Sequence, residues 1–354
     1  MKRYGNLYAK IYDMDNLRLA HKNARKDKLF YKEVKMVDSD EDSYLVAIQQ
    51  MLTDKTYRVS KYQVSTITDK GKERVLAKLP YFPDRIIQWA VMLQIEHIFL
   101  ESFCDFTCAS IKGRGIAQAQ KYLRRYLEDV DGTKYCLKLD IYHFYPSIDH
   151  EILKSLLRKK FKDEDLLWLL DMIIDSSPTP VGIPIGSYLS QFFANYYLAF
   201  FDHWLKENSK CKYIVRYMDD VVVLSESKEQ LHQLRKDIDV YLQDELKLQL
   251  KGNWQVFPVD SRGIDFIGYR QFHGYSLLRK RTAKRFKKRM VYIRKKVSNG
   301  NLMNYGDWCA VNSYDGWLQH SDCTRLREKY VTPLEAPAKR YYMEVVKNDR
   351  NQKC

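Results

Sequence analysis

The chain has 354 residues, 45% of them hydrophobic, and its 60 Lys and Arg against 45 Asp and Glu give a formal net charge of +15. This length allows a sizeable core and more than one structural unit. No apolar run is long enough to span a bilayer, and the basic N-terminus leads into no apolar segment, so we expect a cytoplasmic protein without a secretory signal.

The excess of positive charge favours a polyanionic partner such as nucleic acid, because cationic side chains on a phosphate backbone release condensed counterions. From charge alone, a basic surface without such a partner is an equal alternative. The seven cysteines include no paired CxxC spacing. Cys104 and Cys108 could form half of a metal site on a helix, but no second half follows, which favours scattered reduced thiols.

The first part of the chain is predicted to be mostly helical. Residues 1 to about 60 carry apolar side chains at helical spacing. Tyr62 to Pro80 has the pattern of short strands. Pro83-Asp84 then opens a strongly apolar helix over Ile86 to Leu100. No internal repeat or low-complexity linker interrupts the chain.

Strands and helices alternate in the rest of the chain. The predicted elements are a buried strand (Lys134 to Ile141), a helix (His150 to Ile174), a Pro- and Gly-rich loop, a helix (Leu189 to Trp204), a strand-turn-strand unit (Tyr213 to Leu224), a helix (Glu229 to Leu246) and a short strand (Phe266 to Tyr269). Beyond Leu277 the chain becomes densely basic and helical, with Phe286, Met290 and Ile293 at helical spacing.

Two adjacent carboxylates, Asp219 and Asp220, interrupt an otherwise apolar, β-prone run. Buried charge is costly unless it is paired or binds a metal. In a straight strand the two side chains would point to opposite faces, but at a tight turn one or both can reach a common cation. The alternative is an ordinary polar turn in a hairpin.

A third carboxylate, Asp140, ends the apolar strand Leu137 to Asp140 and is followed by Phe144 and Tyr145. If this strand lies beside the hairpin, three carboxylates converge, which is the ligand set that hard cations such as Mg²⁺ prefer. Two such ions could activate a primer 3′-hydroxyl and stabilise the leaving pyrophosphate. Taken alone, Asp140 could instead cap a helix.

The segments Asp140-Ile141-x-x-Phe144-Tyr145 and Tyr217-Met218-Asp219-Asp220, about 80 residues apart, resemble motifs A and C of reverse transcriptases. Ala109 to Gly115 resembles the second block of that family, and Ile185 to Gln191 resembles the motif B loop. Phe266-Ile267-Gly268-Tyr269 resembles the strand that grips the primer. The resemblance runs from about Arg74 to Tyr269.

The resemblance implies an α+β, right-hand polymerase fold with fingers, a palm carrying an antiparallel sheet, and a helical thumb. Fingers and palm would occupy residues 1–270, and the basic thumb residues 271–354. Two Mg²⁺ ions, with Mn²⁺ as a substitute, would be bound by Asp140, Ile141, Asp219 and Asp220. A motif in Asn312 to Trp317 resembles thumb-helix packing without a chemical role.

The resemblance also implies contacts with dNTPs and with the template and primer. The residues matching dNTP-contacting positions are Lys72, Arg74, Tyr145, Ile185, Gly186 and Gln191. Those matching template- or primer-contacting positions are Arg114, Tyr217, Met218, Gly268, Arg279, Lys280 and Lys284. Tyr145 would stack under the incoming sugar and block a 2′-hydroxyl, with core packing as its alternative; surface solvation is the alternative for Lys72 and for the basic helix.

The motif B loop departs from the usual Pro-Gln-Gly form, because Ile185 replaces the Gln near the nascent base pair. The form Ile185-Gly186 with Ser190-Gln191 resembles the reverse transcriptases of diversity-generating retroelements, and Tyr4-Gly5-Asn6-Leu7-Tyr8 is similar to their opening. That group copies a template RNA with frequent errors at adenines, and the cDNA rewrites a variable gene by mutagenic retrohoming. Loss of a polar contact at Ile185 would lower nucleotide selectivity.

The same group implies a small, basic four-helix-bundle accessory protein as a partner, beside template RNA, cDNA and dNTPs. One alternative is a phage-defence enzyme of abortive-infection or retron type; no Val-Thr-Gly triplet marks a retron thumb. A second alternative is a non-catalytic RNA-binding scaffold on the same fold. The presence of all three carboxylates argues against the scaffold.

Overall fold

The computed structural model describes residues 2–69, 72–177, 179 and 181–346, and it consists of two compact units, each built from three stretches of chain. The first unit contains residues 1–112, 139–211 and 233–254, and the second contains 113–138, 212–232 and 255–354. None of the described helices is long and apolar enough to cross a membrane. The predicted boundary between residues 270 and 271 stays a prediction.

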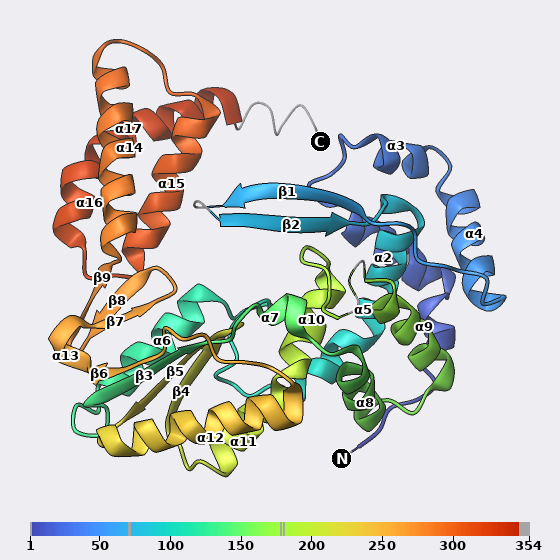
Figure 1. Ribbon diagram of the computed structural model, residues 1–354. Helices are drawn as coiled ribbons and strands as arrows, with labels where there is room; N and C mark the ends of the chain where they lie inside the picture. The colour runs from blue at the N-terminus through green and yellow to red at the C-terminus, as the bar shows by residue number, and fades with distance from the viewer. Residues whose placement is uncertain (1, 70–71, 178, 180, 347–354) are drawn as a thin grey trace. The chain divides into compact units, whose positions relative to one another are not determined.

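The first unit is mainly helical (Figure 1). Its helices are α1 (Tyr8–Ile11), α2 (Met14–Ala24), α3 (Lys32–Ser39), α4 (Glu41–Thr53), α5 (Ile86–Leu100), α7 (Phe144–Ser147), α8 (His150–Lys160), α9 (Glu164–Asp175), α10 (Tyr188–Tyr197) and α11 (Ala199–Glu207). The turn η1 (Tyr81–Arg85), with extended backbone at Phe82, leads into α5. The strands β1 (Gln63–Asp69) and β2 (Lys72–Lys78) form an antiparallel ribbon in which Gln63 pairs with Lys78.

Helix α5 forms the centre of this unit. Its sequence is apolar on every side, which is typical of a helix enclosed by others rather than one lying on a surface. Helices α2 and α10 pack against it. The ring of Phe99 lies 4.9 Å from that of Tyr196 and 6.2 Å from that of Phe192, centroid to centroid. The predicted bounds of this helix, Ile86 to Leu100, are confirmed.

Two predicted long helices are each divided in the structure. The helix predicted over His150 to Ile174 is broken into α8 and α9, and Asp163 caps the start of α9 by accepting a hydrogen bond from the Leu166 backbone N–H. The same carboxylate also accepts hydrogen bonds from the backbone N–H groups of Leu7 and Tyr8. Asp163, at the break between the two helices, therefore also binds the N-terminal segment. The helix predicted over Leu189 to Trp204 is divided at Leu198 into α10 and α11.

The second unit contains a four-stranded sheet in the order β4-β5-β3-β6. The strands are β3 (Tyr135–Asp140), β4 (Tyr213–Tyr217), β5 (Asp220–Ser225) and β6 (Gln255–Pro258). Helix α6 (Ile116–Leu127) packs against β4, with the ring of Tyr126 5.3 Å from that of Tyr213. The buried strand and the strand-turn-strand unit predicted from sequence are confirmed. Helix α12 (Lys228–Leu246) runs from this unit into the first.

A small antiparallel sheet follows helix α13 (Val259–Arg262) and consists of β7 (Ile264–Phe266), β8 (Tyr269–Phe272) and β9 (Tyr275–Leu278). The prediction of one short strand over Phe266 to Tyr269 is wrong, because β7 ends at Phe266 and β8 begins at Tyr269. Ile267 and Gly268 have φ angles of +39° and +95°, and such left-handed backbone turns the chain instead of extending it.

The C-terminal helices are α14 (Lys280–Ser298), α15 (Tyr305–Gln319), α16 (Thr324–Tyr330), α17 (Thr332–Tyr341) and the π-helical turn η2 (Tyr342–Val346). Phe286, Met290 and Ile293 of α14 are almost completely buried, as their helical spacing predicted. Trp317 stacks on the ring of Tyr269 at 5.5 Å, which agrees with a packing role for its motif.

Candidate functional site

Asp219 and Asp220 lie at a two-residue turn in the second unit. The ladder of β4 and β5 ends with Tyr217 opposite Asp220, so Met218 and Asp219 form the turn. Met218 has a φ of +55°, a left-handed conformation that is uncommon for a non-glycine residue. The turn breaks the alternation of a straight strand, which is the geometry that the sequence predicted for the paired carboxylates.

The turn is held by Arg216, which is completely buried despite its charge. Its guanidinium donates a hydrogen bond of 3.0 Å to the carbonyl oxygen of Met218. A buried cation needs hydrogen-bond acceptors to offset lost hydration, and the turn carbonyl is one of them. The backbone beside the two carboxylates is therefore fixed by a side chain from the preceding strand.

Lys138 of β3 is a cationic neighbour of the hairpin that the sequence analysis did not single out. Its ammonium lies 3.9 Å from Oδ1 of Asp220 and donates a hydrogen bond of 2.7 Å to the carbonyl oxygen of Asp265. β3 and β5 are neighbours in the sheet, so this contact follows from strand order. The sequence feature that could have pointed to Lys138 is its position two residues before Asp140.

Asp140 ends β3, and its carboxylate belongs to the first unit. Lys251 contacts it twice: the ammonium lies 2.9 Å from Oδ2, and the backbone N–H donates to the Asp140 carbonyl oxygen at 2.8 Å. The next residue, Ile141, is buried and forms a bridge with Leu250. This pairing fixes the backbone at Asp140, and no local sequence signal pointed to Lys251.

The predicted metal ligands fall in both units, with Asp140 and Ile141 in the first and Asp219 and Asp220 in the second. Within the described residues, no three His, Cys, Asp or Glu side chains group closely enough to hold a metal ion. The metal site stays a prediction.

Tyr145 and the Pro- and Gly-rich loop are brought together in the first unit. The backbone N–H of Ile183 donates to the carbonyl oxygen of Tyr145 at 3.0 Å, and that of Gly182 donates to Ile148 at 2.8 Å. Gly182 has a φ of +91°, and a Cβ there would come within 2.7 Å of the Pro146 backbone. Only glycine allows this close approach, which places the loop against the residues that follow Asp140.

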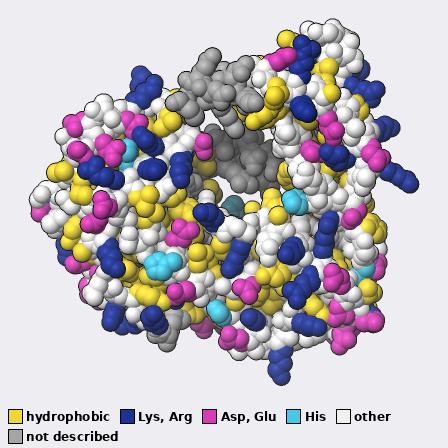
Figure 2. Space-filling model, turned by 180° about the vertical axis from the view of Figure 1, so that it is seen from behind, with side chains coloured by type: hydrophobic (Ala, Val, Ile, Leu, Met, Phe, Trp, Pro, Cys, Tyr) yellow, Lys and Arg dark blue, Asp and Glu magenta, His cyan; other side chains and the backbone are white. Residues whose placement is uncertain are grey.

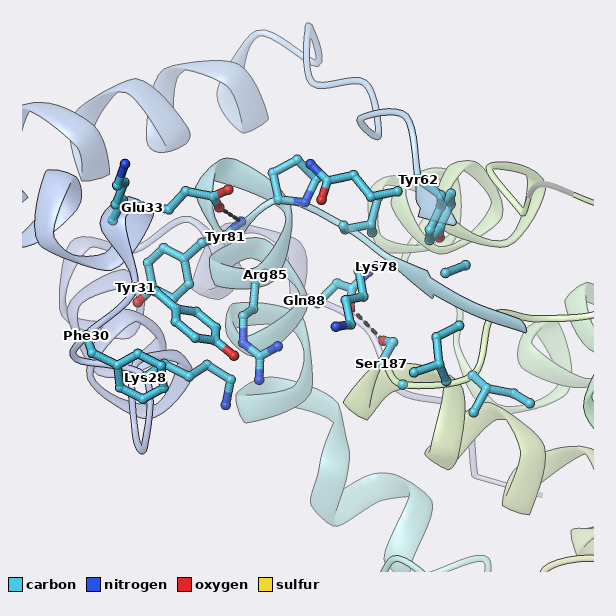
Figure 3. Close-up of a pocket in the computed structure, with 18 residues that line it drawn as sticks. Lys28, Phe30, Tyr31, Glu33, Tyr62, Lys78, Tyr81, Arg85, Gln88 and Ser187 are labelled. Carbon is cyan, nitrogen blue, oxygen red and sulfur yellow. Dashed lines mark hydrogen bonds between the residues drawn. The ribbon is translucent and has the colours of Figure 1, made fainter. Parts of the chain in front are cut away.

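The loop residues Ile185, Gly186 and Ser187 form part of the wall of a pocket of about 540 Å³, entirely within the first unit (Figure 3). Gly186 has a φ of +117°, so the turn itself requires glycine although space for a Cβ is open. Gln191 lies half-buried in the first turns of α10. Ile185 and Gly186 therefore share the pocket wall, whereas Gln191 is not among the residues that line it.

The wall of the same pocket carries four cationic side chains, Lys28, Lys32, Lys78 and Arg85, and one carboxylate, Glu33 (Figure 3). Burial, and then the charge of Arg85, lower the pKa of the Lys28 ammonium. Burial also lowers the pKa of Arg85. Among the described residues neither forms an ion pair; Arg85 donates to the Ala24 carbonyl oxygen at 3.3 Å. The excess of positive charge on this wall suits a phosphate-bearing ligand.

Lys72 and Arg74 lie in β2, where their backbones pair with Asp69 and Ile67. Their side chains, like residues 70 and 71 of the ribbon turn, lie outside the described part of the structure. The predicted contact of these two cations with a triphosphate therefore stays a prediction.

The predicted template- and primer-contacting residues lie in the second unit. Arg114 is half-buried just before α6, and Gly268 accepts a hydrogen bond of 2.9 Å from the Arg279 backbone N–H. Arg279 also pairs with Asp265 at 2.5 Å, whereas Lys280 and Lys284 are exposed on α14. On the face shown in Figure 2, Lys and Arg side chains are interspersed with Asp and Glu.

The amino-acid sequence is similar to a known protein family and to individual known proteins. The family described as reverse transcriptase (RNA-dependent DNA polymerase) matches residues 59–270. Protein YkfC of Escherichia coli is 24% identical over 60% of this chain, and the group II intron-encoded protein LtrA of Lactococcus lactis is 23% identical over 75% of it. The chain spans 65% and 54% of the lengths of these two relatives.

Solved structures of similar fold include apo telomerase from Candida tropicalis and telomerase from Candida albicans in complex with a fragment of telomeric RNA. The TM-scores are 0.51 and 0.50 at 11% identity, over 66% and 82% of this chain and 50% and 61% of those chains. These similarities, with the mixed helices and strands, confirm the predicted fold class of a right-hand polymerase.

Proposed function

Because the chain belongs to the reverse transcriptase family of RNA-dependent DNA polymerases, we propose that it copies a template RNA into cDNA by two-metal nucleotidyl transfer. Asp140, Asp219 and Asp220 are the proposed metal-binding carboxylates, with the backbone of Ile141 beside them. The observation that carries this assignment is the two-residue turn that presents Asp219 and Asp220 at the end of a buried hairpin.

The chemistry of these donors fits a hard divalent cation, which prefers carboxylate oxygens. Asp140 and Asp220 each have a lysine ammonium nearby, Lys251 and Lys138, as expected for ionised carboxylates that attract positive charge. When bound, two Mg²⁺ ions, or Mn²⁺ in their place, would activate the primer 3′-hydroxyl and stabilise the leaving pyrophosphate.

The chain's own residues bind and orient the nucleotide in this proposal. Tyr145 is the wall against a 2′-hydroxyl, and the hydrogen bond from Ile183 to its carbonyl oxygen supports a fixed position for its backbone. Ile185, Gly186 and Gln191 lie along the incoming dNTP, and Lys72 and Arg74 contact its triphosphate. Arg114, Tyr217, Met218, Gly268 and the basic residues Arg279, Lys280 and Lys284 contact template and primer.

We further propose that the copying is error-prone at template adenines, within a diversity-generating retroelement. The support is the apolar Ile185 in the loop beside the nucleotide, where a polar side chain would discriminate among bases by hydrogen bonding. A small, basic four-helix-bundle accessory protein is the proposed partner. Residues 271–354 are the proposed thumb, and 1–270 the fingers and palm.

The test is dNTP incorporation on a primed RNA template with Mg²⁺, comparing the purified wild-type chain with an Asp219→Ala, Asp220→Ala double variant and sequencing the cDNA. Activity lost in the variant, with errors concentrated opposite adenines, supports both parts of the proposal. Accurate cDNA retains the polymerase and favours a phage-defence or retron-like role. Equal activity in both proteins overturns the metal assignment, and no activity, with or without the accessory protein, favours an RNA-binding scaffold.

A further inference from the structure

The loop Ile185–Ser187 is attached to helix α5 by a side chain 99 positions earlier in the sequence. Ser187 Oγ donates a hydrogen bond of 2.6 Å to Oε1 of Gln88 (Figure 3). Gln88 is 8% exposed and lies in the first turn of α5. Exchanging the O and N of the amide would still leave one end of Gln88 on Ser187, because a hydroxyl can both donate and accept.

Ser187 connects this contact to the start of helix α10. It is the N-cap residue, and its Oγ accepts a hydrogen bond of 3.5 Å from the backbone N–H of Ser190. The neighbouring pair repeats the attachment, since Trp89 stacks on Tyr188 with ring centroids 4.8 Å apart. The adjacent residues Gln88 and Trp89 of α5 therefore each contact one of the two residues at the end of the loop.

Between Ile185 and Ser187, the described contacts leave this part of the loop largely open. Gly186 has a left-handed φ and no atom within 4 Å of where its Cβ would lie. Ile185 and Ser187 are only half-buried. Glycine restricts the backbone less than any other residue, so the hydrogen bond at Ser187 limits where Ile185 can lie.

From these contacts we propose that Gln88 is a positioning residue for nucleotide selection: through Ser187 it sets the location of Ile185 and Gly186 at the incoming dNTP. This inference rests on the proposed function of the loop. Gln88 acts through Ser187, and because Gln88 is itself buried, water has little access to replace the serine hydroxyl as its partner.

The test measures single-nucleotide incorporation by the full chain on a primed RNA template, for Gln88→Met, Ser187→Ala and the double variant. Methionine has a similar size but cannot hydrogen-bond to Ser187. We expect each single variant to raise KM for the correct dNTP about fivefold to tenfold, as loss of one partly buried hydrogen bond implies, with kcat changed less than about twofold. The double variant should equal Ser187→Ala, because without the serine hydroxyl Gln88→Met has no further bond to that residue to remove.

Two matched variants separate positioning from general stability. Gln94 lies in the same helix and donates a hydrogen bond of the same length, 2.6 Å, to Asn16, away from the loop. Gln94→Met should lower Tm without changing KM. Ser187→Thr retains both the hydroxyl and the helix cap, so it should restore the wild-type KM that Ser187→Ala loses.

A wild-type chain that incorporates no dNTP overturns the proposed function and this inference together. An active wild type with an unchanged KM in Gln88→Met overturns the inference alone. Additive effects in the double variant, or an equal KM change in Gln94→Met, would also overturn it. If Gln88→Met does not fold, the comparison of Ser187→Ala with Ser187→Thr decides, and equal KM values in those two variants reject the inference.

Discussion

The ammonium of Lys251 lies 2.9 Å from Oδ2 of Asp140, although the two residues are 111 positions apart. Both side chains are partly exposed. The cation occupies an oxygen that the proposed function assigns to a metal ion. Lys251 and the metal therefore compete for Asp140, and the backbone hydrogen bond between the same two residues keeps them adjacent.

Replacing Lys251 by Met should lower the Mg²⁺ concentration that gives half-maximal incorporation. Partly exposed ion pairs contribute about 0.2–1 kcal/mol, so the expected decrease is about 1.4-fold to fivefold. The measurement is a Mg²⁺ titration of activity. Lys247→Met is the matched control, because Lys247 forms a similar pair with Asp149 at 2.7 Å in the same segment. A higher or unchanged Mg²⁺ requirement in Lys251→Met would contradict the competition.

Gly268 should tolerate alanine poorly because of Trp317. A Cβ at Gly268 would overlap the Trp317 ring, and the φ of +95° adds backbone strain. Gly274 has a similar φ of +82° with open space around it, so Gly274→Ala reports strain alone. We expect losses of unfolding free energy of about 1 kcal/mol for Gly274→Ala and about 3 kcal/mol for Gly268→Ala. Equal losses in denaturant unfolding would show that the overlap is relieved.

The helices and strands that depend on local pattern could be predicted from the sequence. The apolar run of α5 and the spacing of Phe286, Met290 and Ile293 gave the correct elements, because burial follows the helical repeat. The Asp219-Asp220 turn was also predicted, since paired charges rarely continue a buried strand. These features need only neighbours along the chain.

The remaining features depend on contacts between distant segments. The turn at Ile267 and Gly268 was mistaken for a strand because its apolar residues and aromatic flanks are β-prone, while the Trp317 ring that fits over Gly268 is 49 positions away. The attachments of Lys251 to Asp140 and of Gln88 to Ser187 likewise have no local pattern. The break after Lys160 was predictable in part, because Asp163 is a good N-cap residue.

Asp307 should make the stability of the C-terminal helices depend on pH. Its side chain is 1% exposed and pairs with Lys296 at 2.7 Å and Arg289 at 2.8 Å. Burial alone would raise the pKa of this carboxyl, but the hydrogen bonds from Lys296 and the Asn304 backbone outweigh burial, so the pKa is lowered. A lowered pKa contributes stability that is present above the unfolded value, near 4, and lost as the pH falls below it.

The corresponding variant is Asp307→Asn, which should lose about 2 kcal/mol of unfolding free energy at pH 7. This is less than for a fully buried pair, because both cations keep partial contact with water. The difference from wild type should be constant from pH 5 to 7 and shrink below about pH 4. Asp131→Asn serves as the control, since that carboxylate is 91% exposed and pairs with Lys134 at the surface. A difference as large at pH 3 as at pH 7 would contradict the assignment.

Ile185→Gln should make the enzyme more accurate opposite template adenines. A glutamine amide in the loop could hydrogen-bond to the nascent base pair, whereas isoleucine cannot, and one such bond discriminates by about 1 kcal/mol, or about fivefold. Steady-state misincorporation opposite each template base measures the effect. Ile185→Leu, which keeps the apolar character and volume, should retain the wild-type error rate. Unchanged errors in Ile185→Gln would remove Ile185 as the cause of low selectivity, and equal gains in both variants would assign the effect to loop packing instead of the lost polar contact.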